Sequence, residues 1–444
     1  CVSPRCRFVC SLRPRRQCPH HVRMDVPLPD RMRLVLERLG PTFVKLGQVV
    51  ALRPDYVPVA YAEALRGLHD HVAPFEGEVA VAVVERELGA AIGELFAEFD
   101  AEPFAAASLS QVHRGVLPDG RAVAVKVQRP GAAEQMERDL ELLAILARRI
   151  ERRRPEALGF RPSAAVSELM ETTRRELDFR REARTASRLR AAFVDDERVV
   201  IPWVDRTRTT AQVLTMELID GRRPAPAQEL RAEGFDADAL LQTGARAMLH
   251  QLFELGTFHA DPHPGNVLFL SGDRVAFLDF GMFGRLGRRE RRRMGFVLWA
   301  LIDGDYDTVG DQLLPFAELA PDADVASFRD ALGDVVEDWY GGMGEQMSVA
   351  RLFLHELGAG ARFGVVFPRD LLLVARALVG IDATATLIAP DVAFADLVRP
   401  LLGDLRATLL PGPHQLQEAV ERRRFDYLQL ALELPDLLPD LLVA

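Results

Sequence analysis

Apolar residues recur at helical spacing along most of this chain of 444 residues. Residues 30–52 carry two such patterns, with Asp30 as the expected cap of the first helix and Gly40 at its end. Residues 60–70 and 75–89 continue the pattern. Since residues three or four positions apart share one face of a helix, we expect a helical region up to about residue 100.

Residues 103–128 show a different pattern, in which apolar and polar residues alternate. A Pro-Asp-Gly sequence at 118–120 separates two β-rich runs, and this combination predicts a hairpin. In the second run, alternation places three valines on one face and Lys126 on the other. A surface lysine near the end of a strand would give the same pattern, so alternation alone leaves the role of Lys126 open.

Charged helices are predicted after the hairpin. Residues 132–152 form a helical pattern that ends in a cluster of arginines. Such a cluster complements the negative end of a helix dipole, and it would also suit an anionic membrane surface. Apolar spacing then predicts one continuous helix from about Ser163 to Phe193.

Three acids lie within this second helix, namely Glu176, Asp178 and Glu182. Asp178 and Glu182 are four positions apart, which on a continuous helix places them on one face. One of the three acids could pair with Lys126. Alternatively, all three balance neighbouring arginines at the surface.

Two short β-like runs, at 199–201 and 212–218, lead into the second half of the chain. They fit the last strand of a small lobe, after which the backbone near Glu217 and Leu218 would form a hinge that binds adenine. A buried strand that ends at a turn would look the same. A helix is predicted at 237–256.

Beyond residue 281 the pattern is mostly helical. The apolar stretches at 294–302 and 371–388 are too short, or too interrupted by charge, to read as membrane spans, and we expect buried helices there. The basic run Arg288–Arg293 is expected to begin an exposed helix.

Composition and charge narrow the class of protein. The chain is 48% hydrophobic and 27% charged, as in soluble globular proteins, and its length favours two lobes or two domains. A formal net charge of −10 argues against a general nucleic-acid binder.

The first eighteen residues contain all four cysteines: Cys1, Cys6, Cys10 and Cys18. Their spacing lacks the paired C-x₂-C of structural zinc sites and supports no disulfide framework, which fits a reducing cytosol. The segment is rich in Arg and Pro and lacks the apolar core of a secretory signal. We expect residues 1–23 to be a disordered leader, with Met24 as an alternative start.

The strongest chemical signal lies between residues 258 and 281. Asn266 follows Asp261 by five positions, and Asp279 follows Asp261 by eighteen. Protein-kinase-like phosphotransferases use an Asp, an Asn and a second Asp in this order. The first Asp orients the nucleophile, while an amide oxygen and the second carboxylate hold Mg²⁺ against phosphate oxygens. A polar turn between buried strands is the simpler alternative, but two motifs at the correct spacing favour metal-assisted phosphotransfer.

The loop before the hairpin departs from ordinary protein kinases. It reads Ala105, Ala106, Ala107 and Ser108, where those kinases place glycines against phosphate. Methyl groups restrict positive φ and stiffen the loop, so we expect altered phosphate contacts and nucleotide preference.

Together these residues resemble the UbiB (AarF-type) family of atypical kinases, over roughly residues 30–300. The correspondence covers its K-x-G-Q motif (Lys45 and Gln48), its Ala-rich loop (Ala105 to Ser108), its V-A-I-K lysine (Lys126), its E-x-D motif (Glu176 and Asp178), its H-x-D-P-H-P-G-N loop (Asp261 and Asn266) and its D-F-G (Asp279). Ser110 stands where the family commonly has Gly. On spacing alone, Lys45 and Gln48 would be an ordinary solvated helix face.

The resemblance implies an α+β, two-lobed protein-kinase-like fold with an N-terminal helical extension. It implies that Glu182 is the αC glutamate that pairs with Lys126. It also implies that Lys45 approaches Glu176 and Asp178, so that the extension acts as a lid and blocks peptide access. The implied cofactors are ATP and Mg²⁺.

The implied activity is that of an atypical kinase or ATPase in quinone or other isoprenoid-lipid metabolism. The expected domains are the leader at 1–23, the extension at 24–100, the small lobe at 101–220 and the helical lobe at 221–444. Expected partners are ATP, an anionic membrane or isoprenoid lipid, and a lipid-biosynthesis complex, with no nucleic acid. The expected location is the cytoplasm, or peripheral contact with the inner face of the membrane.

Two alternatives stay open. A small-molecule phosphotransferase of the aminoglycoside or choline kinase type has a similar catalytic loop, although the K-x-G-Q and Ala-rich motifs argue against it. A nucleotide-binding scaffold without turnover is the second, although every catalytic position is filled.

Overall fold

The computed structural model describes residues 26–51, 59–66, 68, 74–107, 109–153, 162–340, 353, 357–358, 360–392 and 394–409. The leader at 1–23, its four cysteines and Ser108 lie outside the described residues.

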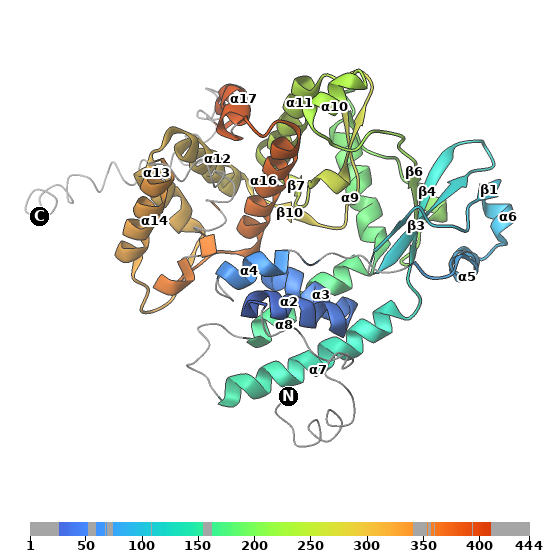
Figure 1. The fold of residues 1–444 in the computed structure, drawn as a ribbon, viewed down its shortest axis with the longest axis horizontal. Helices are drawn as coiled ribbons and strands as arrows, with labels where there is room; N and C mark the ends of the chain where they lie inside the picture. The colour runs from blue at the N-terminus through green and yellow to red at the C-terminus, as the bar shows by residue number, and fades with distance from the viewer. Residues whose placement is uncertain are drawn as a thin grey trace, which may run out of the picture.

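A small antiparallel sheet forms one lobe (Figure 1). Its strands run in the order β1-β3-β4-β6, and β2 pairs with the N-terminal part of β3. The strands are β1 (Glu98–Phe99), β2 (Ala105–Ala106), β3 (Ser110–Val116), β4 (Ala122–Gln128) and β6 (Val213–Glu217). The predicted hairpin is confirmed, because β3 and β4 pair along their full lengths and Gly120 takes a φ of 87° in the turn.

The two faces of this sheet have different neighbours. The helices α5 (Gly77–Leu88) and α6 (Ile92–Leu95) cover one face, on which Val123, Val125 and Val127 are fully buried. Lys126 points to the opposite face, as predicted, where α9 packs through Phe179.

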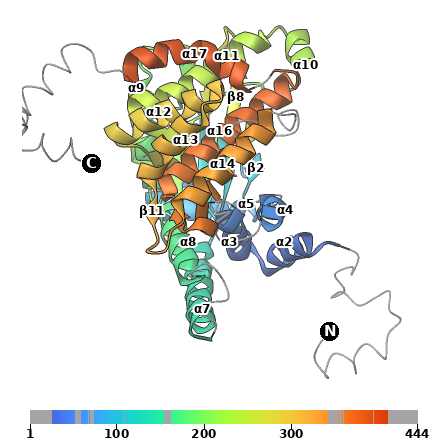
Figure 2. The ribbon, with the colours of Figure 1, turned by 90° about the vertical axis from the view of Figure 1, so that its left-hand side faces the viewer.

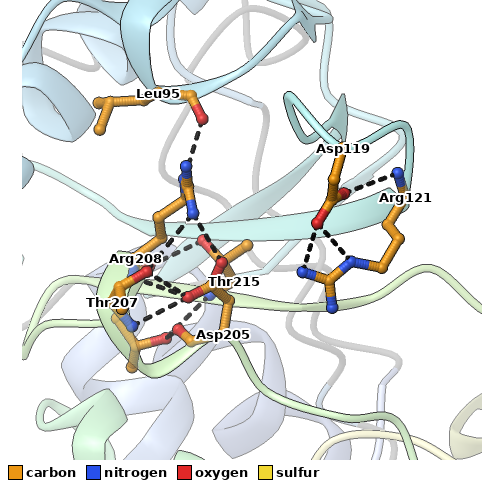
Figure 3. Close-up of polar contacts among 8 residues, drawn as sticks. Leu95, Asp119, Arg121, Asp205, Thr207, Arg208 and Thr215 are labelled. Atoms are coloured by element: carbon orange, nitrogen blue, oxygen red, sulfur yellow. Dashed lines mark hydrogen bonds and ion pairs between the residues drawn. The ribbon is translucent and has the colours of Figure 1, made fainter.

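Arg208 ties the loop before β6 to the rest of the small lobe (Figure 3). Its Nε donates to the carbonyl of Leu95 at 2.9 Å, and its Nη1 donates to Asp205 at 2.9 Å. Asp205 also accepts from the backbone N–H of Thr207 at 2.9 Å. In return, the Thr215 hydroxyl of β6 donates to the carbonyl of Arg208 at 2.8 Å. These bonds fix the position of β6, the edge strand of the sheet.

The prediction of one continuous helix from Ser163 to Phe193 is wrong, because the helix is interrupted at Asp178. The structure has α8 (Pro162–Glu176) and α9 (Phe179–Ala192), and it places α7 (Ala132–Arg153) before them. Asp178 has extended backbone angles and accepts from the N–H of Arg180 as the N-cap of α9. Aspartate competes for backbone N–H groups and so favours caps over helix interiors. The expected shared helix face of Asp178 and Glu182 is therefore absent.

The second lobe is mainly helical. Its helices are α10 (Ala227–Ala232), α11 (Ala237–His250), α12 (Arg288–Asp303), α13 (Tyr306–Leu313), α14 (Val325–Tyr340), α16 (Arg369–Ile388) and α17 (Phe394–Leu409). The largest hydrophobic cluster joins these helices to α9. The expected two-lobed α+β architecture, with a β-rich lobe and a helical lobe, is confirmed (Figure 1).

Short strands carry residues 257–285, which include the Asp261, Asn266 and Asp279 candidates. β7 (Thr257–His259) pairs with β10 (Phe283–Arg285), and β8 (Val267–Leu270) pairs with β9 (Arg274–Phe277). β5 (Val199–Val200) pairs in parallel with β9, so it joins this sheet rather than the small lobe. β11 (Glu318–Leu319) and β12 (Val365–Val366) form a separate pair.

One described helix, α16, is long and apolar enough to cross a membrane by length and composition. However, 72% of its apolar window is buried against the rest of the protein. The expected buried helix at 371–388 is therefore confirmed, and α16 serves as a core helix.

The expected N-terminal extension begins with α2 (Leu28–Leu39), α3 (Pro41–Ala51) and α4 (Val59–Arg66), which share a small hydrophobic cluster. In Figure 1 these helices lie beside α7 and α8, below the junction of the lobes. The expected cap role of Asp30 is wrong, because α2 begins at Leu28 and Asp30 lies in its first turn. In the first turn, the negative charge of Asp30 still stabilises the helix, because it interacts with the positive end of the helix dipole.

Candidate active site

Lys126 and Glu182 form a buried ion pair between β4 and α9. The Lys126 Nζ lies 3.1 Å and 3.0 Å from the two carboxylate oxygens of Glu182. Glu182 also accepts from the backbone N–H of Phe280 at 3.3 Å. Its side chain is only 5% exposed. Of the three acids in the sequence, the structure therefore brings Glu182 to Lys126.

Asp279 completes a charged triad with this pair. One of its carboxylate oxygens lies 3.8 Å from the Lys126 Nζ. Burial alone would lower the pKa of Lys126, but the charges of Asp279 and Glu182 outweigh it and raise that pKa above its usual range. In turn, the Lys126 ammonium lowers the pKa of Asp279. Lys126 is therefore a stable cation and Asp279 a stable anion near neutral pH.

The backbone at Asp279 is in the left-handed region, with a φ of 55°. Non-glycine residues adopt this conformation rarely, and Asp tolerates it better than most. The carboxylate accepts from the N–H of Gly281 at 3.1 Å, and the side chain remains 51% exposed. An exposed, anionic oxygen ligand beside Lys126 suits a metal that also contacts phosphate.

His259 lies buried beside the candidate loop and contacts the backbone of both Asp261 and Leu278. It is fully buried, its Nε2 lies 2.9 Å from the carbonyl of Leu278, and its Nδ1 lies 3.1 Å from the N–H of Asp261. A carbonyl can only accept and an N–H can only donate, so the ring is neutral with its proton on Nε2. Burial lowers the pKa of His259, which favours this neutral form.

Asn266 and Asp261 are joined across the loop. The Asn266 side-chain amide donates to the carbonyl of Asp261 at 3.1 Å, which leaves the Asn266 Oδ1 as an acceptor. The carbonyl of Asn266 accepts from the N–H of Leu278 at 2.8 Å, next to Asp279. These bonds bring the two expected metal ligands onto adjoining backbone segments.

The donor set fits Mg²⁺. An amide oxygen from Asn266 and a carboxylate from Asp279 are the hard oxygen ligands that this ion takes, with phosphate and water filling the other positions. In the described part of the chain, no group of three or more His, Cys, Asp or Glu side chains forms a protein-only metal cage.

The Ala-rich segment is part of the sheet. Ala105 and Ala106 pair with Val112 and Gln111, and the Ala107 N–H donates to the carbonyl of Ser110 at 2.8 Å. None of the three alanines has positive φ, so the described loop needs no glycine. At the other end of the sheet, the Leu218 N–H donates to the carbonyl of Ala122 at 3.2 Å, just after Glu217 ends β6.

The extension reaches the site through Lys45. Lys45 on α3 forms an ion pair with Glu176 at the end of α8, and both side chains are largely buried. The Thr42 hydroxyl donates to Asp139 of α7 at 2.7 Å. Gln48 instead donates to the carbonyl of Leu68 at 3.3 Å, within the extension.

Asp178, the second acid of the E-x-D motif, has other contacts than Glu176, the first. It caps α9 and binds the Arg180 guanidinium at 2.7 Å. Burial opposes ionisation of Asp178, but its bonds to Arg180 outweigh that effect and lower its pKa.

Sequence reasoning missed two contributors. Arg376 of α16 lies 2.8 Å from the Asp261 carboxylate. Gln251, in a π-helical turn after α11, accepts from the N–H of His259 at 3.0 Å. The sequence did offer a signal for Arg376, which is an arginine in the middle of an apolar helix. It offered none for Gln251, which looks like an ordinary polar helix residue.

Comparison with known proteins agrees with this geometry. Residues 67–313, more than half of the chain, match the ABC1 atypical kinase-like domain. The chain is 32% identical over 418 residues to a probable protein kinase UbiB of Marinobacter nauticus, a match that covers 93% of this chain and 76% of that protein. It is 33% identical over 398 residues to a probable protein kinase UbiB of Xylella fastidiosa, covering 88% and 72%.

A solved complex of Rv3197 with erythromycin from Mycobacterium tuberculosis has a similar fold. The match covers 82% of this chain and 96% of that one, with a TM-score of 0.51 and 24% identity. At this identity the likeness supports the fold alone.

Proposed function

This chain belongs to the UbiB family of ABC1 atypical kinase-like proteins, and from that premise we propose that it binds Mg²⁺·ATP and acts as an atypical kinase or slow ATPase. The observation that carries the proposal is the triad of Lys126, Glu182 and Asp279 beside the loop that holds Asp261 and Asn266.

Each side chain has a task in the proposed reaction. Lys126 contacts the α- and β-phosphates, and Glu182 holds it in place. Asp261 orients the nucleophile, which is water or a substrate hydroxyl. The Ala105–Ala107 segment covers the phosphates, and the backbone at Glu217 and Leu218 binds adenine.

Asn266 and Asp279 would hold the metal. When bound, Mg²⁺ neutralises charge on the phosphate oxygens and orients them. The αL backbone of Asp279 and the bond from Asn266 to the carbonyl of Asp261 fix the two ligands before nucleotide arrives.

The extension acts as a lid in this proposal. Lys45 and Glu176 pair in a largely buried position, where a charge-assisted hydrogen bond is strong. Gln48 braces α3 internally, and Asp178 fixes the start of the helix that carries Glu182. A peptide would have to displace these contacts, so a water, small-molecule or lipid acceptor fits better.

The wider role that we propose is support of ubiquinone-type or other isoprenoid-lipid metabolism, in keeping with the name of the UbiB relatives. Domain limits at residues 23, 100 and 220 are part of the same proposal. A lipid-biosynthesis complex is the proposed protein partner, with the protein in the cytoplasm or at the inner face of a membrane.

The helix α7 supports an anionic membrane surface as a partner. Leu142, Ile145, Leu146 and Ile150 are exposed along α7, and its last turns carry Arg148, Arg149, Arg152 and Arg153. Apolar side chains flanked by arginine match a surface of acyl chains and anionic headgroups.

Replacement of Asp279 tests nucleotide binding directly. Asp279→Asn should abolish Mg²⁺-dependent stabilisation by ATP in a thermal-shift titration, because the metal loses its charged ligand. Asp273→Asn is a matched control, since Asp273 also has a φ of 55° but lies in the turn between β8 and β9. Unchanged Mg²⁺·ATP affinity in Asp279→Asn would refute the assignment.

An ATPase assay then separates enzyme from scaffold. Turnover is measured with and without anionic liposomes and a quinone-precursor mimic, for wild type and Asp279→Asn. Turnover that requires Asp279 supports an enzyme, whereas nucleotide binding without turnover under all conditions supports the scaffold.

A further inference from the structure

One face of α16 packs on the catalytic loop. Arg376 binds Asp261, and one turn later a Cβ on Gly380 would lie 2.9 Å from the ring of Pro262. A further turn on, the Thr384 hydroxyl lies 3.4 Å from the carbonyl of Pro262. The spacing i, i+4, i+8 places all three on one helix face, with glycine where the loop approaches most closely.

Arg376 is costly to keep in this helix. Most of α16 is apolar and buried, and only 24% of the Arg376 side chain is exposed. Its Nη2 donates to the Asp261 Oδ2 at 2.8 Å, while its Nε is buried without a hydrogen-bond partner among the described residues. A charged side chain with an unpaired donor is a poor choice for packing alone. The contact with Asp261 therefore indicates a role for Arg376 beyond packing.

The catalytic loop lacks a cation of its own. Residues 258–266 include no Lys or Arg. Lys126 pairs with Glu182 and Asp279 and, in the proposed function, contacts the α- and β-phosphates rather than Asp261. Negative charge develops on the transferred group and its neighbours during phosphoryl transfer. Enzymes usually stabilise this charge with fixed positive groups.

We propose that Arg376 is a positioning residue for phosphoryl transfer, which holds Asp261 by its Oδ2 so that the Oδ1 faces the nucleophile. This inference rests on the proposed function. The nucleophile oxygen bonds to the γ-phosphorus, and the bond from that phosphorus to the β,γ-bridging oxygen breaks, so that ADP leaves. The proton of the nucleophile passes to Asp261 and then to solvent.

The test is a double-mutant cycle on turnover. Arg376→Gln should lower kcat about 100-fold, because small misplacements of a catalytic group have effects of this size, with the KM for ATP within about twofold of wild type. In an Asp261→Asn background the same change should have almost no further effect, since Arg376 acts through Asp261. Arg376→Lys should restore part of kcat.

Arg399→Gln is the matched control. Arg399 of α17 pairs with Asp303 of α12 at 3.5 Å, which is also an Arg–Asp contact between helical-lobe segments. It should leave kcat unchanged. The inference would be overturned if the double variant lost kcat by the product of the two single losses. It would also be overturned if Arg376→Gln kept the wild-type kcat.

Hydrogen exchange separates this inference from the proposed function. Arg376→Gln should speed amide exchange in residues 258–266, while Arg399→Gln should not. If wild type shows no ATP turnover, the proposed function fails, and this measurement still decides whether Arg376 holds the loop through Asp261. Unchanged exchange in residues 258–266 would then refute it.

Discussion

Glu182 connects three parts of the site, although its sequence neighbourhood offers three candidate acids. It binds Lys126 on β4, lies on α9, and accepts from Phe280 in the D-F-G segment. The distinction arises because Asp178 leaves the helix to become a cap, while Glu176 ends the preceding helix and pairs with Lys45. Residue type and spacing alone could not make that choice.

His259 gives the catalytic loop a predictable response to pH. Its pKa is lowered by burial from its ordinary value of 6.5, so the unfolded chain binds this proton more readily than the folded protein. The contribution of neutral His259 to stability is complete above pH 6.5 and is lost as pH falls from there toward the lower folded pKa. Acid should therefore destabilise the fold through this residue.

We expect the free energy of unfolding to fall further in wild type than in His259→Gln between pH 7.0 and 5.5, by up to about 1 kcal/mol. Denaturant unfolding at each pH measures it. Equal pH dependence in wild type and His259→Gln would contradict the prediction.

Among the elements, α3 is the one whose placement matters most for access. It contributes Lys45 to Glu176 and Thr42 to Asp139, so it is attached to both α8 and α7. The sequence could place Lys45 on a helix face, but only the resemblance to a family indicated what that face meets. The lid role is a prediction that the ion pair supports.

Lys45→Ala should release this attachment. The Glu176 carboxylate would lose its buried partner, and we expect faster hydrogen exchange in residues 176–182 without global unfolding. Arg33→Ala is a suitable control, because Arg33 pairs with Glu37 on the surface of α2. Identical exchange in wild type and Lys45→Ala would count against the lid.

At the scale of the whole molecule, α7 runs along the lower edge in Figure 1 and projects below the body in Figure 2. Its inner side packs through Met136, Leu140 and Ala147, while its outer side carries exposed leucines and isoleucines. The sequence indicated the arginine cluster at its end, but which apolar residues stay exposed depended on the packing of α8 and α3.

Leu142→Glu combined with Leu146→Glu should weaken binding to anionic liposomes. Two leucines that become buried in the bilayer contribute about 3 kcal/mol to binding. The loss of liposome affinity in a co-sedimentation assay is therefore on the order of 100-fold. ATP turnover without liposomes should not change. Val194→Glu, at another exposed apolar position, is the control. Equal liposome binding by the double variant and wild type would exclude α7 as the contact.

The sequence by itself determined the local elements whose signals lie within a few residues. The β3–β4 hairpin, the direction of Lys126 and the buried character of α16 follow from alternation, a turn sequence and apolar content. The order of Asp261, Asn266 and Asp279 likewise indicated the candidate catalytic segment before any geometry.

Only the tertiary structure decided which distant residues meet. The parallel contact of β5 with β9 and the bond from Arg376 to Asp261 each join segments far apart in the chain, whereas the pairing of Lys126 with Glu182 was implied by the family resemblance before the geometry showed it. Such contacts depend on how helices pack around one core, and a lone arginine in an apolar helix has no local partner that would reveal its target. Spacing fixes faces and turns, whereas packing fixes partners.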